Sequence, residues 1–255
     1  MGINVALDGP SGAGKSTIAK AVAKKLEYVY VDTGAMYRSI AYYVISKGAD
    51  LSDPEQIKPF LGEISIKLCY TEAGQRVILN DEDVSDKIRT PEISMGASKV
   101  SAIPEVREFL LELQKNIAKE NNIIMDGRDI GTVVLPNADV KIFLTAAPAA
   151  RAERRFKELQ EKGDKSTYDE VLQDIIQRDY NDTHREIAPL KKADDAVEVD
   201  STELTLEESV EAIYNVITDK TKKKERKIKE IMPVRPVKKE HRLGHFHMFW
   251  YTVLR

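Results

Sequence analysis

Apolar residues in the first part of the chain switch from a short run to helical spacing. Residues 3–7, Ile-Asn-Val-Ala-Leu, form an apolar run that ends at a glycine-rich turn, which is typical of a buried strand. From Lys15 onward the apolar positions Ile18, Val22 and Leu26 are four residues apart and share one helix face. The pattern predicts a strand, a tight turn and a helix, in that order.

The same alternation continues along the chain. It predicts strands over 28–31, 122–125, 140–144 and 196–199, and helices over 35–46 and 149–162. Thr205 and Glu208 have the spacing of a capping box, which predicts a last helix running to about Ile217. Alternating strands and helices predict an α/β fold, a parallel sheet with helices on both faces. Ligands of such sheets bind where the carboxyl ends of the strands meet.

One segment, about residues 63–90, departs from this alternation. Ile64, Ile66, Leu68 and Tyr70 fall on every second position, and a turn and a second apolar run follow. Period-two spacing predicts a small antiparallel meander inserted into the α/β body. It is open at this point whether the insert is a surface hairpin without function or a mobile flap over a substrate.

Composition narrows the class of protein. Of 255 residues, 42% are hydrophobic and 32% are charged, which is typical of a globular protein with a sizeable core. No apolar run approaches the roughly 18 residues of a membrane-spanning helix. The single cysteine, Cys69, excludes an internal disulfide and a zinc site of several cysteines, and we expect it to be buried. The first strand begins too early for a signal peptide, so we expect a cytoplasmic protein.

The net charge of −3 hides an uneven distribution. Residues 219–255 contain 12 Lys and Arg against 4 Asp and Glu, which leaves residues 1–218 strongly acidic. This break predicts a domain over 1–218 followed by a basic, poorly ordered tail over 219–255. We expect residues 222–229 to extend the preceding helix as a solvated end.

The end of the tail carries no assignable chemistry. His241, His245 and His247 are closely spaced, but a glycine lies between the first two and no carboxylate follows them, which disfavours a metal site. Residues 247–255 are apolar and too short to span a bilayer. A membrane-surface contact, a fusion remnant and a frayed end all stay open.

The strongest chemical signal is the glycine-rich turn after the first strand. Residues 9–16, Gly-Pro-Ser-Gly-Ala-Gly-Lys-Ser, fit the phosphate-loop pattern and stand between a strand and a helix, as the motif requires. Backbone N–H groups and the helix N-terminus there attract phosphate. Lys15 can reach the β- and γ-phosphates, and Ser16 can bind Mg²⁺. The predicted nucleotide-binding residues are Gly9, Pro10, Ser11, Gly12, Ala13, Gly14, Lys15, Ser16 and Thr17.

Two further stretches follow predicted strands directly. Residues 32–38, Asp-Thr-Gly-Ala-Met-Tyr-Arg, and 126–132, Asp-Gly-Arg-Asp-Ile-Gly-Thr, bring carboxylates and guanidinium groups to the sheet edge where the phosphate loop lies. Their arginines can hold two phosphate oxygens at once. Each stretch also has a purely structural interpretation, a helix cap at Thr33 with a solvated arginine, and an ion-pair cluster around Arg128.

Two predicted helices carry rows of charged side chains. Arg151, Arg154 and Arg155 are three and four positions apart, so that Arg151 meets both others on one face. Because they follow a strand end, we expect a lid over the triphosphate at about 148–166, although helix-surface arginines are usually just solvated. The second row, which can bind phosphate and a base or form an ordinary salt-bridged helix, consists of Arg178, Asp182 and Arg185.

Together these segments resemble the bacterial cytidylate kinase family, nucleoside monophosphate kinases that phosphorylate CMP and dCMP. The resemblance covers about residues 3–218 and rests on residues 9–17, 32–38, 104–107, 126–136 and 178–190, and on an insert at 63–90. It implies a three-layer P-loop nucleoside monophosphate kinase with a central parallel sheet, a small antiparallel insert and a helical lid. In some relatives, serine replaces Thr33 and glycine replaces Ser16.

The resemblance also implies a role for each matched residue. ATP would be the co-substrate, with Mg²⁺ held at Ser16. The residues implied in catalysis are Lys15, Arg128, Asp129, Arg151, Arg154 and Arg185, with Arg155 also in the lid. Those implied in acceptor binding are Thr33, Arg178 and Asp182 for cytosine, Arg38, Arg107 and Arg128 for the phosphate, and Asp129 for the sugar.

The implied partners are the small molecules ATP, CMP and dCMP, with no nucleic acid, no membrane and a monomeric protein. The nearest rival is a monophosphate kinase that acts on AMP, UMP or GMP. A second rival is a nucleotide-sensing or nucleic-acid-binding protein that uses the basic tail as an anchor. The acidic body and the lack of aromatic stacking platforms disfavour this second rival.

Overall fold

The computed structural model describes residues 2–71, 74–161, 163–231 and 250–252. Its centre is a five-stranded sheet with the order β2-β6-β1-β7-β8, in which every neighbouring pair is parallel. The predicted parallel sheet is therefore confirmed, with strand ends within two residues of those expected. The strands are β1 (Asn4–Asp8), β2 (Val29–Asp32), β6 (Ile123–Gly127), β7 (Val140–Thr145) and β8 (Val197–Asp200).

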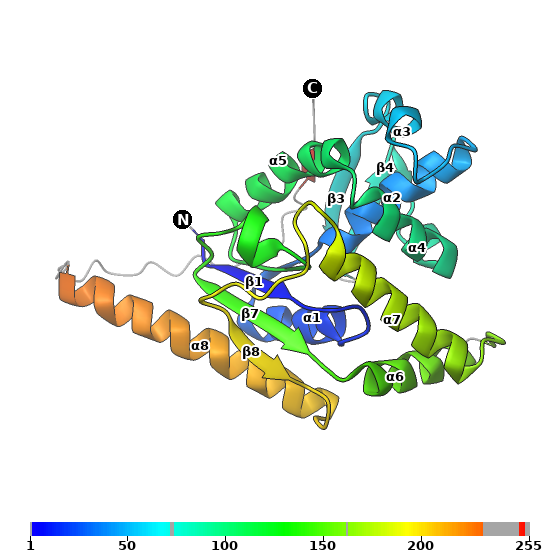
Figure 1. The fold of residues 1–255 in the computed structure, drawn as a ribbon. Helices are drawn as coiled ribbons and strands as arrows, with labels where there is room; N and C mark the ends of the chain where they lie inside the picture. Colours follow the sequence, from blue (N-terminus) through cyan, green and yellow to red (C-terminus); the bar gives the residue numbers. More distant parts are fainter. Residues whose placement is uncertain (1, 72–73, 162, 232–249, 253–255) are drawn as a thin grey trace.

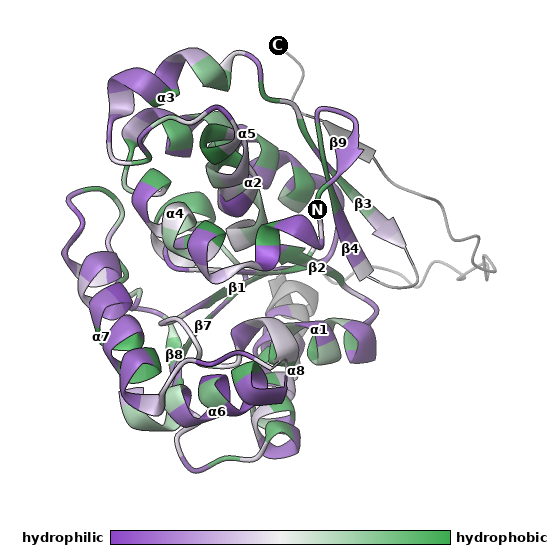
Figure 2. Ribbon diagram, turned by 90° about the vertical axis from the view of Figure 1, so that its right-hand side faces the viewer, coloured by the Kyte–Doolittle hydropathy of each residue, from purple (hydrophilic) through white to green (hydrophobic). Residues whose placement is uncertain are grey.

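Helices cover both faces of this sheet (Figures 1 and 2). Alternate residues of a strand point to opposite faces. In β1, Val5 and Leu7 join one apolar cluster, while Ala6 between them joins the other. The three predicted layers are thus confirmed. The first face carries α1 (Lys15–Leu26) and α8 (Leu206–Ile231), and the second carries α2 (Thr33–Ser46) and α5 (Pro104–Glu120).

The insert forms a second, antiparallel sheet with the order β5-β4-β3-β9. The predicted meander is confirmed. Ile66 and Leu68 are buried in the same apolar cluster as helix α2, so the insert is built into the body rather than set on its surface. Cys69 beside them is also buried, as expected. The strands are β3 (Ile66–Thr71), β4 (Gly74–Leu79), β5 (Glu82–Asp83) and β9 (Trp250–Thr252).

The remaining helices surround the carboxyl edge of the parallel sheet. Helices α6 and α7 pack side by side beyond the ends of β7 and β8 (Figure 1). Helices α3, α4 and α5 were not predicted, although each begins at a proline, a residue favoured at the first helical position. The bounds are α3 (Pro54–Leu61), η1 (Lys87–Arg89), α4 (Pro91–Val100), η2 (Ile130–Val134), α6 (Pro148–Glu161) and α7 (Tyr168–His184).

Helix α8 crosses the boundary expected between domain and tail. It starts at the predicted capping box, where Thr205 and Glu208 each bond the other's backbone N–H, and runs to Ile231. Residues 222–229 extend the helix, as predicted, because Lys and Glu are good helix formers. The first part of the predicted tail, residues 219–231, thus belongs to α8. The histidines at 241, 245 and 247 lie outside the described residues.

In the described part of the chain, no helix combines the length and the apolar character needed to cross a membrane.

Candidate nucleotide-binding site

A cleft of about 520 Å³ opens at the carboxyl edge of the parallel sheet. Its described lining includes nine cationic and six acidic side chains, so it is polar and favours a polyanion. Four predicted site residues, Gly9, Pro10, Ala13 and Arg151, are not part of this lining. The predicted residues that line it are Ser11, Gly12, Gly14, Lys15, Ser16, Thr17, Thr33, Arg38, Arg107, Arg128, Asp129, Arg154, Arg155, Arg178, Asp182 and Arg185.

The phosphate loop has the backbone that its glycines allow. Gly12 and Gly14 have φ values of 76° and 82°, a left-handed conformation that side chains with a Cβ rarely adopt. A Cβ at Gly9 would collide with the carbonyl oxygen of Leu144 on β7. The loop ends at Lys15, the first residue of α1, whose N-terminus therefore opens on the cleft.

Lys15 is held inside the loop. Its side chain donates to the carbonyl oxygen of Pro10 at 2.7 Å, and the residue is only 6% exposed. Burial and the nearby guanidinium of Arg128 lower the pKa of Lys15 to about 7. An anion bound in the loop would favour the charged ammonium and raise this pKa.

Asp126, the last but one residue of β6, lies beside the phosphate loop. Its Oδ2 accepts hydrogen bonds from the Ser16 hydroxyl at 2.7 Å and from the Tyr30 hydroxyl at 3.1 Å. Burial and the neighbouring carboxylate of Asp32 raise the pKa of Asp126 to about 6. The sequence analysis placed Asp126 in a motif but gave it no role. Its position at the end of the strand beside the loop was the available signal.

Ser16 and Asp126 supply a hydroxyl and a carboxylate side by side, a donor set suited to Mg²⁺. Among the described residues, no cluster of three or more His, Cys, Asp and Glu is placed to hold a metal ion. A magnesium ion at Ser16 would therefore take most of its ligands from phosphate oxygens and water, as Mg²⁺ in nucleotide sites usually does.

A second buried carboxylate, Asp8 at the end of β1, holds the loop that follows β6. Its two oxygens accept from the backbone N–H groups of Ile130 at 2.8 Å and Gly131 at 2.7 Å. Burial raises the pKa of Asp8 to about 6 despite these bonds. The loop it anchors carries Arg128 and Asp129. Sequence analysis missed this role, because nothing local links residues 122 positions apart.

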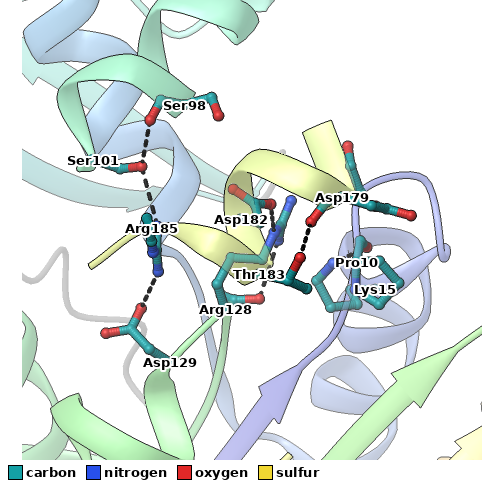
Figure 3. A network of polar contacts seen from close by, with 12 residues as sticks. Pro10, Lys15, Ser98, Ser101, Arg128, Asp129, Asp179, Asp182, Thr183 and Arg185 are labelled. Atoms are coloured by element: carbon teal, nitrogen blue, oxygen red, sulfur yellow. Dashed lines mark hydrogen bonds and ion pairs between the residues drawn. The ribbon is translucent and has the colours of Figure 1, made fainter. Parts of the chain in front are cut away.

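The arginines of the cleft are paired with carboxylates from other segments. Arg128 donates its Nε–H to Asp182 at 2.8 Å, and not to the aspartates that flank it in sequence. Arg107 and Arg185 both pair with Asp129. The hydrogen-bonded partner of Arg128 thus comes from a distant segment, while the alternative of a structural ion-pair cluster stays open. Helices α5 and α7 and the loop after β6 meet through these pairs. Figure 3 shows the pairs of Arg128 with Asp182 and of Arg185 with Asp129.

Ser101, just after α4, is a further residue of this network that the sequence did not predict. Its carbonyl oxygen accepts from Arg107 at 3.1 Å, and its hydroxyl accepts from Arg185 at 3.2 Å. The hydroxyl in turn donates to the carbonyl oxygen of Ser98 (Figure 3). Ser101 and Asp129 thus hold the same two arginines. A serine in a polar stretch carries no sequence signal for such a role.

Asp32, rather than Thr33, caps helix α2. Its Oδ1 accepts from the N–H of Ala35 at 2.9 Å, and its Oδ2 accepts from Arg38 at 2.8 Å. Burial acts to raise the pKa of Asp32, but Arg38 and the capping bond outweigh it, so the pKa is lowered. The interpretation of a cap at Thr33 with a solvated Arg38 is wrong. The Thr33 hydroxyl donates to the carbonyl oxygen of Asp126 at 2.7 Å.

Arg178 on α7, like Arg38 on α2, has one buried polar atom without a partner. Its buried Nε–H has no hydrogen-bond partner. Burial and the charge of Arg128 lower the pKa of Arg178 to about 10. A buried donor without an acceptor is costly, so this side chain favours a ligand that brings one.

The three arginines of α6 lie on one side of the helix, but their guanidinium groups reach different surroundings. Arg154 and Arg155 line the cleft, whereas Arg151 is buried behind it. Each guanidinium turns to a different partner, so the three charges do not converge on one point of the cleft. These partners are Ser11 and Asp179 for Arg151, Ser201 and Thr202 for Arg154, and Glu158 for Arg155.

A parallel sheet, a phosphate loop at the N-terminus of α1 and an arginine-rich cleft facing that loop define the class of P-loop kinases. A sequence model of one such family, described as cytidylate kinase, matches residues 5–219. The chain belongs to the cytidylate kinase family, which confirms the resemblance seen in its motifs.

Individual relatives agree with this assignment. The chain is 52% identical over 214 residues to the cytidylate kinase of Caldicellulosiruptor saccharolyticus, covering 84% of this chain and 95% of that one. It is 49% identical over 215 residues to that of Carboxydothermus hydrogenoformans, covering 84% and 97%. Likeness to solved structures is looser, with a TM-score of 0.42 and 17% identity to shikimate kinase from Bacteroides thetaiotaomicron, over 85% and 98% of the two chains.

Proposed function

We propose that this protein transfers the γ-phosphoryl group of ATP to CMP or dCMP, giving ADP and CDP or dCDP, in pyrimidine nucleotide metabolism. One observation carries the proposal. Arginines from the separate segments α2, α5, α7 and the loop after β6 line one cleft that faces a phosphate loop, in a chain about half identical to cytidylate kinases. Such a cleft neutralises two polyanions at once.

The ATP phosphates would bind at the phosphate loop. Backbone N–H groups of the loop and the ammonium of Lys15 donate to them. On binding, Lys15 exchanges the Pro10 carbonyl oxygen for a phosphate oxygen, a stronger acceptor because it is charged.

We propose that Ser16 and Asp126 hold Mg²⁺ next to these phosphates. Such an ion would supply positive charge that offsets the negative charge developing on the phosphates during transfer. The 2.7 Å bond between the two side chains supports this role, because it already places both oxygens on one side of the loop.

The acceptor nucleotide would bind across the cleft. Arg38, Arg107 and Arg128 would hold its phosphate, exchanging their carboxylate partners for phosphate oxygens. Asp129, released from part of its pairing, would accept from a sugar hydroxyl. These steps convert ion pairs within the protein into ion pairs with the substrate.

Residues of α7 and of the start of α2 would bind the cytosine base. Cytosine presents an amino group that donates and ring atoms that accept. Arg178, whose Nε–H lacks a partner, would donate to the accepting atoms. Asp182 and Thr33 keep lone pairs that can accept from the amino group. This combination suits cytosine better than uracil, which has a carbonyl oxygen where cytosine has the amino group.

The transfer itself needs positioning rather than a general base. The attacking atom is a phosphate oxygen of the acceptor, mostly ionised at neutral pH because its second pKa is about 6. His184, the one histidine of the body, is exposed and stacks on Tyr180 outside the cleft lining. Arg154 and Arg185 would stabilise the negative charge on the phosphoryl group in the transition state of its transfer.

Closure of α6 and of the insert would exclude water, which otherwise competes with the acceptor. The proposal further includes a monomer in the cytoplasm that binds neither nucleic acid nor membrane.

A coupled assay of ADP release, with CMP, dCMP, UMP, AMP and GMP offered in turn, tests the proposal. We expect turnover with CMP and dCMP at least tenfold above that with the others. Faster turnover with AMP, UMP or GMP would assign a different acceptor. Salt-dependent RNA binding without any kinase activity would replace the proposal by the nucleic-acid alternative.

A further inference from the structure

Arg151 is the most enclosed arginine of the α6 row and is 2% exposed. Its Nε–H donates to the carbonyl oxygen of Ala146 at 2.8 Å, which fixes the guanidinium to the end of β7. Its Nη1 donates to the carbonyl oxygen of Ser11 in the phosphate loop at 2.8 Å. A side chain held in this way does not swing into the cleft to bind phosphate, so its effect has to pass through its partners.

The bond to Ser11 sets the direction of one peptide group in the phosphate loop. In a trans peptide the C=O and N–H point to opposite sides. With the Ser11 carbonyl turned toward Arg151, the N–H of Gly12 faces away from it, and Gly12 lines the cleft. A Cβ on Gly12 would lie 3.4 Å from the Cβ of Arg151, so the loop packs directly against this side chain.

The same guanidinium reaches helix α7. Asp179 accepts from Nη1 at 3.0 Å and from Nη2 at 2.5 Å, a two-oxygen pairing that fixes both position and orientation. The neighbouring turns of α7 carry Arg178 and Asp182, the residues proposed to bind cytosine. Asp179 therefore connects helix α7 to Arg151 and, through it, to the phosphate loop.

We propose that Asp179 is a positioning residue that couples the two nucleotide sites: through Arg151 it orients the Ser11–Gly12 peptide of the phosphate loop and fixes the acceptor-binding helix α7 to that loop. Filling either site then stabilises the arrangement that the other site needs. This inference rests on the proposed function for the identity of the two nucleotides, and it assigns Arg151 to positioning instead of phosphate contact.

The test compares wild type with Asp179→Asn, Asp179→Ala and Asp179→Glu. Calorimetry measures the CMP dissociation constant with and without a saturating non-hydrolysable ATP analogue. We expect wild type to bind CMP at least fivefold more tightly with the analogue than without it. In Asp179→Asn and Asp179→Ala the two CMP dissociation constants should be nearly equal. Asp179→Glu keeps the charge, so the analogue should again tighten CMP binding, although less than in wild type. Asp169→Asn, the same change at an exposed site on α7, is the matched control.

A second measurement reports on the conformation of the phosphate loop. The Gly12 amide resonance in a ¹H–¹⁵N spectrum should shift in Asp179→Ala and stay in place in Asp169→Asn. In steady-state assays, Asp179→Ala should raise KM for ATP and for CMP about five- to tenfold, with a smaller change in kcat. If Asp179→Ala does not fold, Asp179→Asn carries the same expectations.

Wild type without coupling, or a folded Asp179→Ala with unchanged coupling and an unchanged Gly12 resonance, would overturn the inference. A lower melting temperature as the sole effect would also overturn it, because that result reports a purely structural ion pair. Failure of the proposed function looks different. In that case wild type would not turn over CMP, while the effect of Asp179 on Gly12 and on binding of the ATP analogue would persist.

Discussion

Arg128 and Asp182 are 54 positions apart in the chain, yet the Nε–H of the arginine donates to the carboxylate at 2.8 Å. Burial acts to lower the pKa of Arg128, but Asp182 outweighs it and the pKa is raised. The pair holds the guanidinium at the centre of the cleft before any ligand binds. An arginine prepared in this way loses little conformational entropy when phosphate replaces the carboxylate.

Replacing Arg128 with alanine should lower kcat/KM for CMP by about 10³-fold, because a guanidinium that neutralises a transferring phosphate contributes at this level. The fold should persist. Loss of the pair leaves Asp182 unpartnered and should lower the free energy of unfolding by about 1–3 kcal/mol. Steady-state kinetics and urea unfolding of the purified variant measure the two effects. Arg128→Lys is the matched control. It keeps the positive charge, but its ammonium cannot bind two phosphate oxygens in the bidentate way of a guanidinium. Wild-type turnover in a folded Arg128→Ala protein would contradict the role.

Replacing Asp126 with asparagine should raise the Mg²⁺ concentration for half-maximal activity at least tenfold, since a neutral amide binds Mg²⁺ more weakly than a carboxylate. The hydrogen bonds from Ser16 and Tyr30 can be kept by the amide oxygen, so the structure should change little. A Mg²⁺ titration of turnover at saturating ATP and CMP gives the measurement. An unaltered Mg²⁺ requirement would remove Asp126 from the proposed metal site.

Binding of ADP without Mg²⁺ should take up protons. The pKa of Lys15 is about 7 in the free protein, lowered by burial and by Arg128, and bound phosphate raises it again. At pH 8 most Lys15 is neutral before binding and charged after it, so uptake should approach one proton per site. It should fall to about half a proton at pH 7. Calorimetry in two buffers with different ionisation heats measures the proton number. Zero uptake at pH 8 would show that Lys15 is already charged in the free loop.

Ending the chain after Lys220 should leave kcat and both KM values within twofold of wild type. The last described residue that lines the cleft is Arg185, far before the cut. The cut removes β9, an edge strand of the insert sheet, whose neighbour β3 lines no part of the cleft. It also removes an ion pair between Lys224 and Asp139, but Lys224 is half exposed, and such pairs contribute less than about 1 kcal/mol. Kinetics of the shortened protein provide the check, with thermal unfolding alongside. A loss of more than fivefold in kcat would give the tail a role that the cleft does not reveal.

Most of the architecture follows from local pattern. The five parallel strands were predicted because apolar runs and helical spacing alternate, and the insert because Ile64 to Tyr70 repeat with period two. Helices α3, α4 and α5 were not predicted, although each starts at a proline. The composition break at 219 falls inside helix α8, because a change in charge does not interrupt helical backbone bonds, which continue to Ile231.

The functional site also has one part that the sequence predicts and one part that it does not. By itself the sequence determined the phosphate loop, because all of its glycines, its lysine and its hydroxyl lie within eight consecutive residues and their backbone geometry is local. Only the tertiary structure decided which charge faces which. Three arginines of one helix, alike in sequence, turn to three different partners, and Arg151 leaves the cleft for Ser11 and Asp179. The physical reason is that burial forces each charge to find an opposite one, and which carboxylate lies within reach depends on how distant segments pack.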